Sequence, residues 1–230
     1  MKIKWSALVG DVRNKLNGSV ASKNRYGSYF RTKTTPVNPQ TSHQQAARQI
    51  LGNISSSWRA LTESQRKSWD AGAVNFPFTD IFGDQMTLSG QALFIKLNSN
   101  LEKIGQPRIN TAPLPQGFEE LALESASVTL TSGSISAMEL SLNLATVPAG
   151  YSLAVYATPP INAGRSFVKN QFRFLGTAAV TAGDADIETL YVDRFGAAAI
   201  AGQSIHFRVA LVNNTTGQQS VPVSTVALLA

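Results

Sequence analysis

The spacing of hydrophobic residues changes from helical to strand-like near the middle of the chain. Between residues 41 and 104, apolar residues recur every three or four positions, which is typical of amphipathic helices. Beyond residue 118, apolar and polar residues alternate, and this period of two predicts half-buried β-strands. The pattern therefore predicts an N-terminal module with helices, followed by a C-terminal region of strands.

Three helix starts are marked by capping residues. Thr41 and Thr62 are each followed three residues later by glutamine, so each threonine can form a capping box. Ser89 precedes a third apolar stripe over residues 90–104, and Gly105 follows it as a stop. We expect three short helices.

The first two helices share a set of large apolar residues. We expect Trp58, Leu61 and Trp69 to form a structural core that holds these helices together. The apolar stripe of the first helix comprises Ala47, Ile50, Leu51, Ile54, Trp58 and Leu61. Helical spacing places these side chains on one face.

Residues 17–34 are predicted to form a β-hairpin. Asn17-Gly18 has the composition of a tight turn, and the segment from Asn24 to Gly27 supplies a second one. Prolines in residues 36–41 exclude a helix there, and residues 74–88 suit a loop with a short hairpin. Basic and aromatic residues interleave in the first hairpin, which suggests a contact arm, although an ordinary solvated hairpin has the same pattern. The candidate assembly contacts are Lys23, Arg25, Tyr26, Tyr29, Arg31 and Lys33.

The C-terminal region is predicted to be all-β. Candidate strands cover residues 122–131, 135–145, 151–158, 168–181, 186–192, 204–213 and 219–228. About seven short strands in a hundred residues are typical of an immunoglobulin-like sandwich. The closing segment, Gly202 through Pro222, resembles the last hairpin of fibronectin type III domains.

These patterns divide the chain into two modules and a linker. Residues 1–110 would form a basic α+β module of β-hairpins and three short helices. Residues 111–118 are proline-rich and would act as a stiff linker. Residues 119–230 would form the immunoglobulin-like or fibronectin-type β-sandwich.

Charge is distributed unevenly over the chain. Residues 1–115 carry 15 Lys and Arg against 6 Asp and Glu, whereas residues 116–230 carry 5 against 8. Charged residues make up only 15% of the chain, compared with about a quarter in average proteins. A basic first half suggests nucleic acid, an acidic partner or contact between copies of the chain.

The residues needed for catalysis are scarce. The chain has no cysteine and two histidines, His43 and His206, which we expect at surface or edge positions. No metal-ligand spacing, phosphate-binding loop or nucleophile motif occurs in the sequence. We expect a protein without enzymatic activity, cofactor, metal or small-molecule substrate. We also expect no signal peptide, because Asp11 and Arg13 interrupt the basic start of the chain before an apolar segment of useful length. We expect no membrane association, because no apolar run approaches the length of a membrane span.

The N-terminal sequence resembles a group of uncharacterised structural proteins of tailed bacteriophages and prophages, many associated with Bacteroidetes. The resemblance rests on three motifs: Gly27-Ser28-Tyr29-Phe30-Arg31; Pro36-Val37-Asn38-Pro39-Gln40-Thr41; and Trp58-Arg59-Ala60-Leu61-Thr62 with Gln65-Arg66 and Trp69. It spans about 60 residues well and 110 loosely, and several members of the group append an immunoglobulin-like domain. It implies a virion structural protein (capsid decoration, neck or tail). Such a protein would be made in the bacterial cytoplasm and would bind copies of itself and other virion proteins.

A second resemblance supports an alternative function. Residues 50–69 look like the middle of an HMG box, a domain that bends DNA from the minor groove. The sequence departs from that family because Pro77 follows Trp69 closely and a proline-rich stretch replaces the preceding helix. DNA binding through these helices is therefore the alternative function. If the chain is instead a virion structural protein, we expect any contact with nucleic acid to be weak and non-specific.

Overall fold

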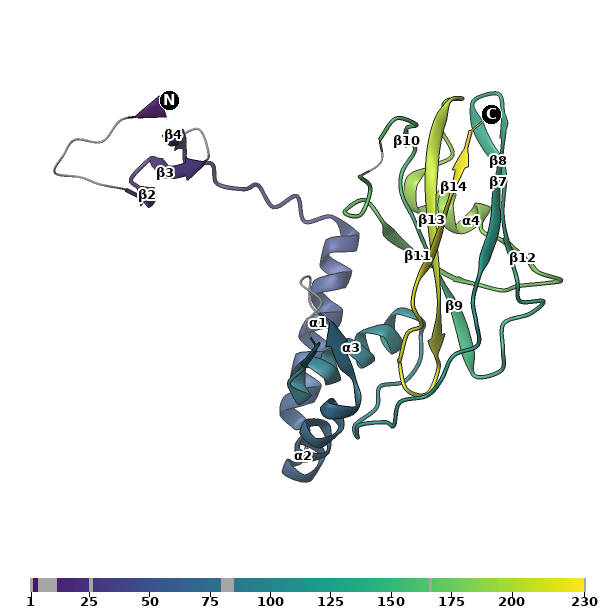
Figure 1. Cartoon of the computed structure of the whole chain (residues 1–230), viewed down its shortest axis with the longest axis horizontal. Helices are drawn as coiled ribbons and strands as arrows, with labels where there is room; N and C mark the ends of the chain where they lie inside the picture. The colour runs from purple at the N-terminus through teal and green to yellow at the C-terminus, as the bar shows by residue number, and fades with distance from the viewer. Residues whose placement is uncertain (1, 4–11, 25–26, 80–84, 166, 230) are drawn as a thin grey trace. The chain divides into compact units, whose positions relative to one another are not determined.

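The computed structural model describes residues 2–3, 12–24, 27–79, 85–165 and 167–229 (Figure 1). Over these residues the chain has four α-helices and antiparallel strands in several sheets, so it is a mixed α+β protein with substantial β content. The chain divides into two compact units, one ending at Gln45 and one starting at Ala46.

The first unit contains a four-stranded antiparallel sheet with the order β1-β4-β3-β2. The predicted hairpin is confirmed, because β3 pairs with β4 in a register that places Asn24 opposite Gly27. Asn17 adopts a φ of 50° in the turn before β3, a conformation that Asn tolerates better than most residues. The outer strands were not predicted. The bounds are β1 (Lys2–Ile3), β2 (Asn14–Leu16), β3 (Ser19–Asn24) and β4 (Gly27–Thr32).

The first helix, α1 (Ser42–Ala60), begins where the sequence predicted. The hydroxyl oxygen of Thr41 accepts a hydrogen bond from the backbone N–H of Gln44 at 3.4 Å. The predicted stripe was too wide, since the Leu51 side chain is 51% exposed. Consecutive helical residues are turned by about 100° from one another. The buried face therefore follows Ile50, Ile54 and Trp58 and leaves Leu51 at its margin.

The next two helices also begin at the predicted caps. The Thr62 hydroxyl accepts from the backbone N–H of Gln65, whose side chain accepts from the backbone N–H of Thr62, which completes the capping box. The Ser89 hydroxyl accepts from the N–H of Ala92 at 3.3 Å. The bounds are α2 (Glu63–Gly72), a 3-10 turn η1 (Ala73–Asn75), β5 (Pro77–Thr79), β6 (Gln85–Thr87) and α3 (Gly90–Lys103).

Two sheets make up most of the C-terminal region. A three-stranded sheet has the order β12-β8-β7, and a larger one has the order β10-β13-β9-β11, with β14 also paired to β13. Figure 1 shows β7 and β8 beside β13 and β14 (at the right of the view). The bounds are β7 (Leu123–Thr131), β8 (Ser134–Leu142), β9 (Tyr151–Ala157), β10 (Ile161–Asn162), β11 (Arg173–Ala178), β12 (Asp184–Asp186), β13 (Gln203–Asn213) and β14 (Val223–Leu228).

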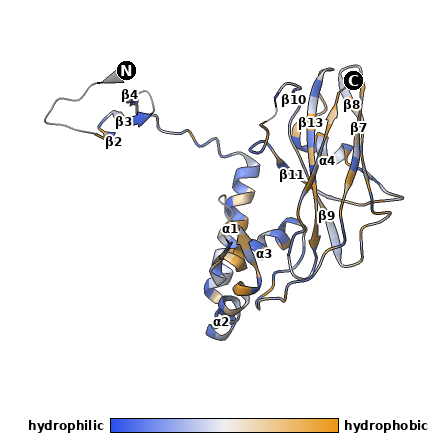
Figure 2. Cartoon of the chain, in the orientation of Figure 1, coloured by the Kyte–Doolittle hydropathy of each residue, from blue (hydrophilic) through white to orange (hydrophobic). Residues whose placement is uncertain are grey.

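Both sheets contribute to one hydrophobic core. Met138 and Leu140 of β8 face Val155 of β9 and Phe207 of β13 within a single buried cluster. Strand alternation in the first part of β13 explains this arrangement, because Ile205, Phe207 and Val209 are buried in the core while His206 and Arg208 between them are partly exposed. From Val209 to Asn213 every residue is buried. Figure 2 shows the hydrophobic residues that these strands supply.

One predicted strand is a helix. Residues 186–192 were expected to form a strand, but α4 (Glu188–Phe195) occupies most of this range. The backbone N–H of Glu188 donates to the Asp186 carboxylate at 3.0 Å, which forms an Asx turn just before the helix, although the N-cap residue Ile187 makes no side-chain cap. Ile187 and Tyr191 are both fully buried and four residues apart, so helical spacing buries them on the same side. A short apolar run fits either period, and the tertiary core selects the helix.

The proline-rich segment connects the helices to the two sheets and contacts both. The Trp69 indole N–H donates to the carbonyl of Asn110 at 2.9 Å, and the N–H of Gln116 donates to the side chain of Gln218 at 2.9 Å. The Asn100 side chain in α3 also donates to the carbonyl of Gly217, in the turn between β13 and β14, at 2.9 Å. Independent folding of residues 119–230 stays a prediction.

Candidate assembly surface

The N-terminal sheet carries cations on one of its faces. The strand registers place Lys15 opposite Val20, and Val20 opposite Arg31, in one row across β2, β3 and β4. Opposed residues point to the same face of a sheet, and so do residues two apart in a strand. Tyr29 therefore shares the face of Arg31. This cationic face joins residues that are 16 positions apart in the sequence.

A pocket of about 340 Å³ opens on the cationic face. Its positive charges come from Lys15, Arg31 and Lys33, and among the described residues that line it there is no carboxylate. The backbone N–H of Lys33 donates to the carbonyl of Gly18 at 2.9 Å, which ties the end of β4 to the turn before β3. The lining residues are Lys15, Val20, Arg31, Thr32, Lys33, Thr34, Thr35 and Pro36.

The absence of acidic residues extends well beyond the pocket in sequence. No Asp or Glu occurs from residue 12 to residue 62, whereas eight Lys and Arg do. The side chains of this stretch therefore carry a positive net charge. An array of this kind attracts polyanions or acidic protein surfaces.

The six candidate assembly contacts do not gather on one face. Tyr29, Arg31 and Lys33 belong to the cationic face or its continuation. Lys23 is exposed and lies on the opposite face with Ala21 and Phe30, according to the register of β3 and β4. Arg25 and Tyr26 lie outside the described residues.

The three predicted core residues lie together in the second unit. Trp69 is fully buried, and its ring meets that of Phe94 at 5.2 Å between centroids in an edge-on contact. Trp58 contacts the same Phe94 ring at 5.3 Å, and Leu61 is 6% exposed in the same cluster. The tryptophans therefore hold α1 and α2 against α3.

Two groups of residues lie at surface pockets that the sequence did not indicate. The first group includes Lys15, which the sequence shows only as a charged residue and not as a neighbour of Arg31 on one face. Its position two residues before the Asn17-Gly18 turn is the signal that places it across that turn, opposite Val20. The second group includes His206 and Arg208, which line a pocket on the larger C-terminal sheet. β13 pairs with strands on both sides, so His206 is not on an edge strand.

No family model, curated protein or solved structure matches the chain. Over the part of the chain that the structure describes, no helix is both long and apolar enough to cross a bilayer. Nor do three or more potential ligand side chains gather at a metal-binding distance among these described residues.

Proposed function

We propose that this chain is a non-enzymatic structural subunit of a tailed-bacteriophage virion, acting through protein–protein contacts in the capsid decoration, neck or tail. In this proposal the N-terminal sheet is the contact module, and its cationic face binds an acidic surface of a neighbouring subunit. The second unit is the folded body that the sheet attaches to the particle.

The observation that carries this proposal is how few side chains are buried among the described residues of the N-terminal unit. Among the described residues from 12 to 45, Ala21 alone is buried, and Leu16 is 56% exposed. Small sheets need an apolar face covered by other elements to be stable in water. A partner on the cationic face would neutralise Lys15, Arg31 and Lys33. Leu16 lies on the opposite face, so complete burial of the sheet requires contacts on both faces.

We further propose that the C-terminal region is an immunoglobulin-like sandwich. In that class the first, second and fifth strands share one sheet, while the third, sixth and seventh share the other. If the two-residue strand β10 is set aside, β7, β8 and β12 are the first, second and fifth strands and share one sheet. The third, sixth and seventh strands, β9, β13 and β14, share the other sheet with the fourth strand, β11. This strand order supports the proposal, and such sandwiches serve widely as interaction modules.

Replacing the cations of the pocket tests the contact role. We expect the full-length variant K15Q/R31Q/K33Q to lose assembly with itself or with co-produced particle proteins. Each substitution replaces a charged side chain by the polar, uncharged side chain of glutamine. Sedimentation velocity of the purified protein and mass spectrometry of purified particles measure the two forms of assembly. K23Q is the control, because Lys23 lies on the other face of the same sheet.

Two results would contradict this proposal. One is a wild-type chain that stays monomeric at every concentration and is absent from particles. The other is normal assembly of the triple variant. A loss of assembly in K23Q as large as in the triple variant would shift the contact to the opposite face and overturn the assignment to the cationic face.

DNA binding is the second candidate, because the same pocket could also accommodate backbone phosphates. Three cations without a carboxylate would give a salt-dependent affinity, with a log–log slope of roughly −3 for three phosphate contacts. Anisotropy of labelled duplex DNA with the full chain measures that slope. Tight binding near physiological salt, with bending of the duplex, would favour the DNA-binding function over the structural one.

A further inference from the structure

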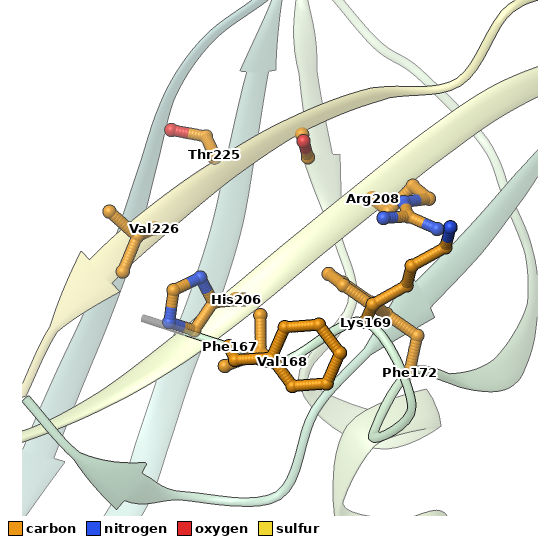
Figure 3. A pocket seen from close by; sticks show the side chains of 9 residues that line it. Phe167, Val168, Lys169, Phe172, His206, Arg208, Thr225 and Val226 are labelled. Carbon is orange, nitrogen blue, oxygen red and sulfur yellow. The ribbon is translucent and has the colours of Figure 1, made fainter. Parts of the chain in front are cut away.

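The larger C-terminal sheet carries a second pocket, on its outer face. The cavity measures about 680 Å³, within the range of roughly 300–1,000 Å³ common for small-molecule sites. Its floor is formed by outward-facing residues of β13 and β14, and its wall by the loop before β11 (Figure 3). The lining residues are Phe167, Val168, Lys169, Phe172, His206, Arg208, Ser224, Thr225 and Val226.

Arg208 reaches this pocket because of strand alternation. Phe207 and Val209 are fully buried in the core, so Arg208 between them must point to the outer face. Its guanidinium carbon lies 4.1 Å from the centroid of the Phe172 ring, a distance typical of a cation–π contact. The aromatic ring fixes the guanidinium group and leaves its N–H donors available to a ligand.

The loop that forms the wall is held by hydrogen bonds. The Arg173 side chain donates to the carbonyls of Asn170 and Phe172, both at 2.9 Å. The N–H of Gln171 donates to the carbonyl of Val168 at 2.9 Å. These bonds order the loop that carries Phe172, and with it the ring against which Arg208 packs.

The charges of the pocket are all of one sign. Lys169 and Arg208 both line it, and in Figure 3 their charged ends point to the same side, away from the Phe167 ring. Among the described lining residues none is acidic, and no Asp or Glu occurs in residues 140–183 or 194–230. Two cations that converge without a carboxylate repel each other, and a bound anion would relieve that repulsion.

The remaining lining residues favour an anion with an apolar body. The Phe167 side chain is 66% exposed and that of Val226 is 53% exposed, so both offer apolar surface beside the cations. The hydroxyl group of Ser224, which lies opposite Arg208 on the outer face, can donate or accept hydrogen bonds. Burial lowers the pKa of His206 below its ordinary value, so near neutral pH the imidazole of the empty pocket is uncharged.

We propose that this pocket binds a small organic anion in which a ring lies directly beside a carboxylate or phosphate group. Arg208 and Lys169 contact the anionic group, and the ring packs between Phe167 and Val226. This function is separate from the assembly role of the N-terminal sheet. Its success or failure leaves the proposed virion function untouched.

Proton NMR of the full-length protein can test this site through its histidines. The chain has only His43 and His206, so His206 reports on the pocket and His43, which is exposed in α1, serves as an internal control. The probes are phenyl phosphate and phenylacetate, compared with inorganic phosphate and benzyl alcohol. We expect saturable shifts of the His206 signals with a ring-bearing anion, and about tenfold weaker binding of the anion or the ring alone.

Substitutions of Arg208 and Lys169 test whether these residues bind the anion that shifts the His206 signals. R208Q and K169Q should each weaken binding of the ring-bearing anion by about tenfold, since each removes one charge-assisted contact. R59Q is the matched control, because it makes the same chemical change at an exposed residue of α1 that does not line the pocket, and it should leave the affinity unchanged. Bound anion should also raise the pKa of His206, because a nearby negative charge favours the protonated imidazole.

Three results would overturn the proposal. These are the absence of a saturable His206 shift with either ring-bearing anion, equal affinity for inorganic phosphate, and unchanged affinity in both R208Q and K169Q. Lys169 is an exposed loop residue, so K169Q keeps the test valid if R208Q does not fold. Binding of only one of the two ring-bearing anions would support the site and identify its anionic group.

Discussion

The N-terminal sheet and the C-terminal sheets use similar backbone pairing but bury very different amounts of apolar surface. Both contain antiparallel strands of six or more residues. Ala21 is the one buried residue among the described residues from 12 to 45, whereas the C-terminal core includes fully buried Leu140, Tyr191 and Phe207. Hydrogen bonds define a sheet, but apolar burial supplies most of the net free energy that keeps it folded. This difference supports the proposal that the first sheet binds a partner.

The helical module belongs with the stable region rather than with the N-terminal sheet. Helices α1 to α3 have their own core around Trp69 and Phe94. The carbonyl of Gly217 accepts a hydrogen bond from Asn100, and an added Cβ at Gly217 would clash with the carbonyl oxygen of Leu97. The close approach of α3 to the β13–β14 turn therefore requires glycine at that position.

The largest expected effect comes from a matched pair of leucine truncations. Leu140 is fully buried and Leu16 is 56% exposed. We expect L140A to lower the free energy of unfolding by about 2–5 kcal/mol, because it removes buried methyl groups and leaves a cavity. L16A should change it by less than about 0.5 kcal/mol. Urea denaturation followed by circular dichroism measures both, and equal losses would disprove the contrast between the two sheets.

The contact between α3 and the β13–β14 turn can be tested with two glycines. Gly217 and Gly202 both have positive φ, at 70° and 84°, but Gly202 has no atom within 4 Å of an added Cβ. G202A should lower the free energy of unfolding by about 1 kcal/mol, through backbone strain alone. G217A adds the clash with the Leu97 carbonyl, and we expect a total of roughly 3 kcal/mol. Thermal unfolding measures the difference, and equal losses would mean that α3 is not held against the turn.

A comparison of the two threonine N-caps tests whether the start of α1 is less firmly ordered than the helical core. Thr62 forms both bonds of the capping box, whereas the Thr41 hydroxyl accepts a single long bond of 3.4 Å. T62A should therefore cost about 1 kcal/mol and T41A only a few tenths. Chemical denaturation of the two variants provides the measurement. A larger loss for T41A would show that the segment before α1 is more firmly ordered than its burial indicates.

The smallest expected effect depends on pH. The hydrogen bonds from Arg108 lower the pKa of the Glu102 carboxyl below its usual value of 4.5, and the two side chains form an ion pair at 2.8 Å. This ion pair stabilises the fold above the ordinary Glu pKa and is lost as the pH falls through the lowered pKa. Since both side chains are partly exposed, this ion pair should contribute less than about 1 kcal/mol to the free energy of unfolding.

The variant E102Q isolates that ion pair. Stability measured by urea denaturation from pH 7 to pH 3 should fall less in E102Q than in the wild type. E63Q is the control, because it removes the highly exposed ion pair between Glu63 and Lys67 in α2, and exposed ion pairs contribute little to stability. Parallel curves for wild type and E102Q would rule out a role of the Arg108–Glu102 pair in linking the helices to the segment after them.

Local signals in the sequence were sufficient to predict most of the helices and several of the strands. The Thr62–Gln65 capping box, the Ser89 cap and the Asn17-Gly18 turn act within a few residues, so their structural outcome could be predicted. The strand period was also informative for β8 and β13, where apolar and polar residues alternate over many positions. It failed at α4, because the short run from Ile187 to Tyr191 can bury its apolar residues in either geometry.

The sequence by itself determined where the elements begin, the uneven charge and the residues available for each surface. Only the tertiary structure decided which of those residues meet. Lys15 and Arg31 come together through strand register, and Phe172 and Arg208 through a loop that folds beside β13. A capping bond needs only a few consecutive residues, whereas these contacts depend on strand order and on which face of each strand is buried. The two surfaces proposed for binding therefore follow from the packing of the sheets.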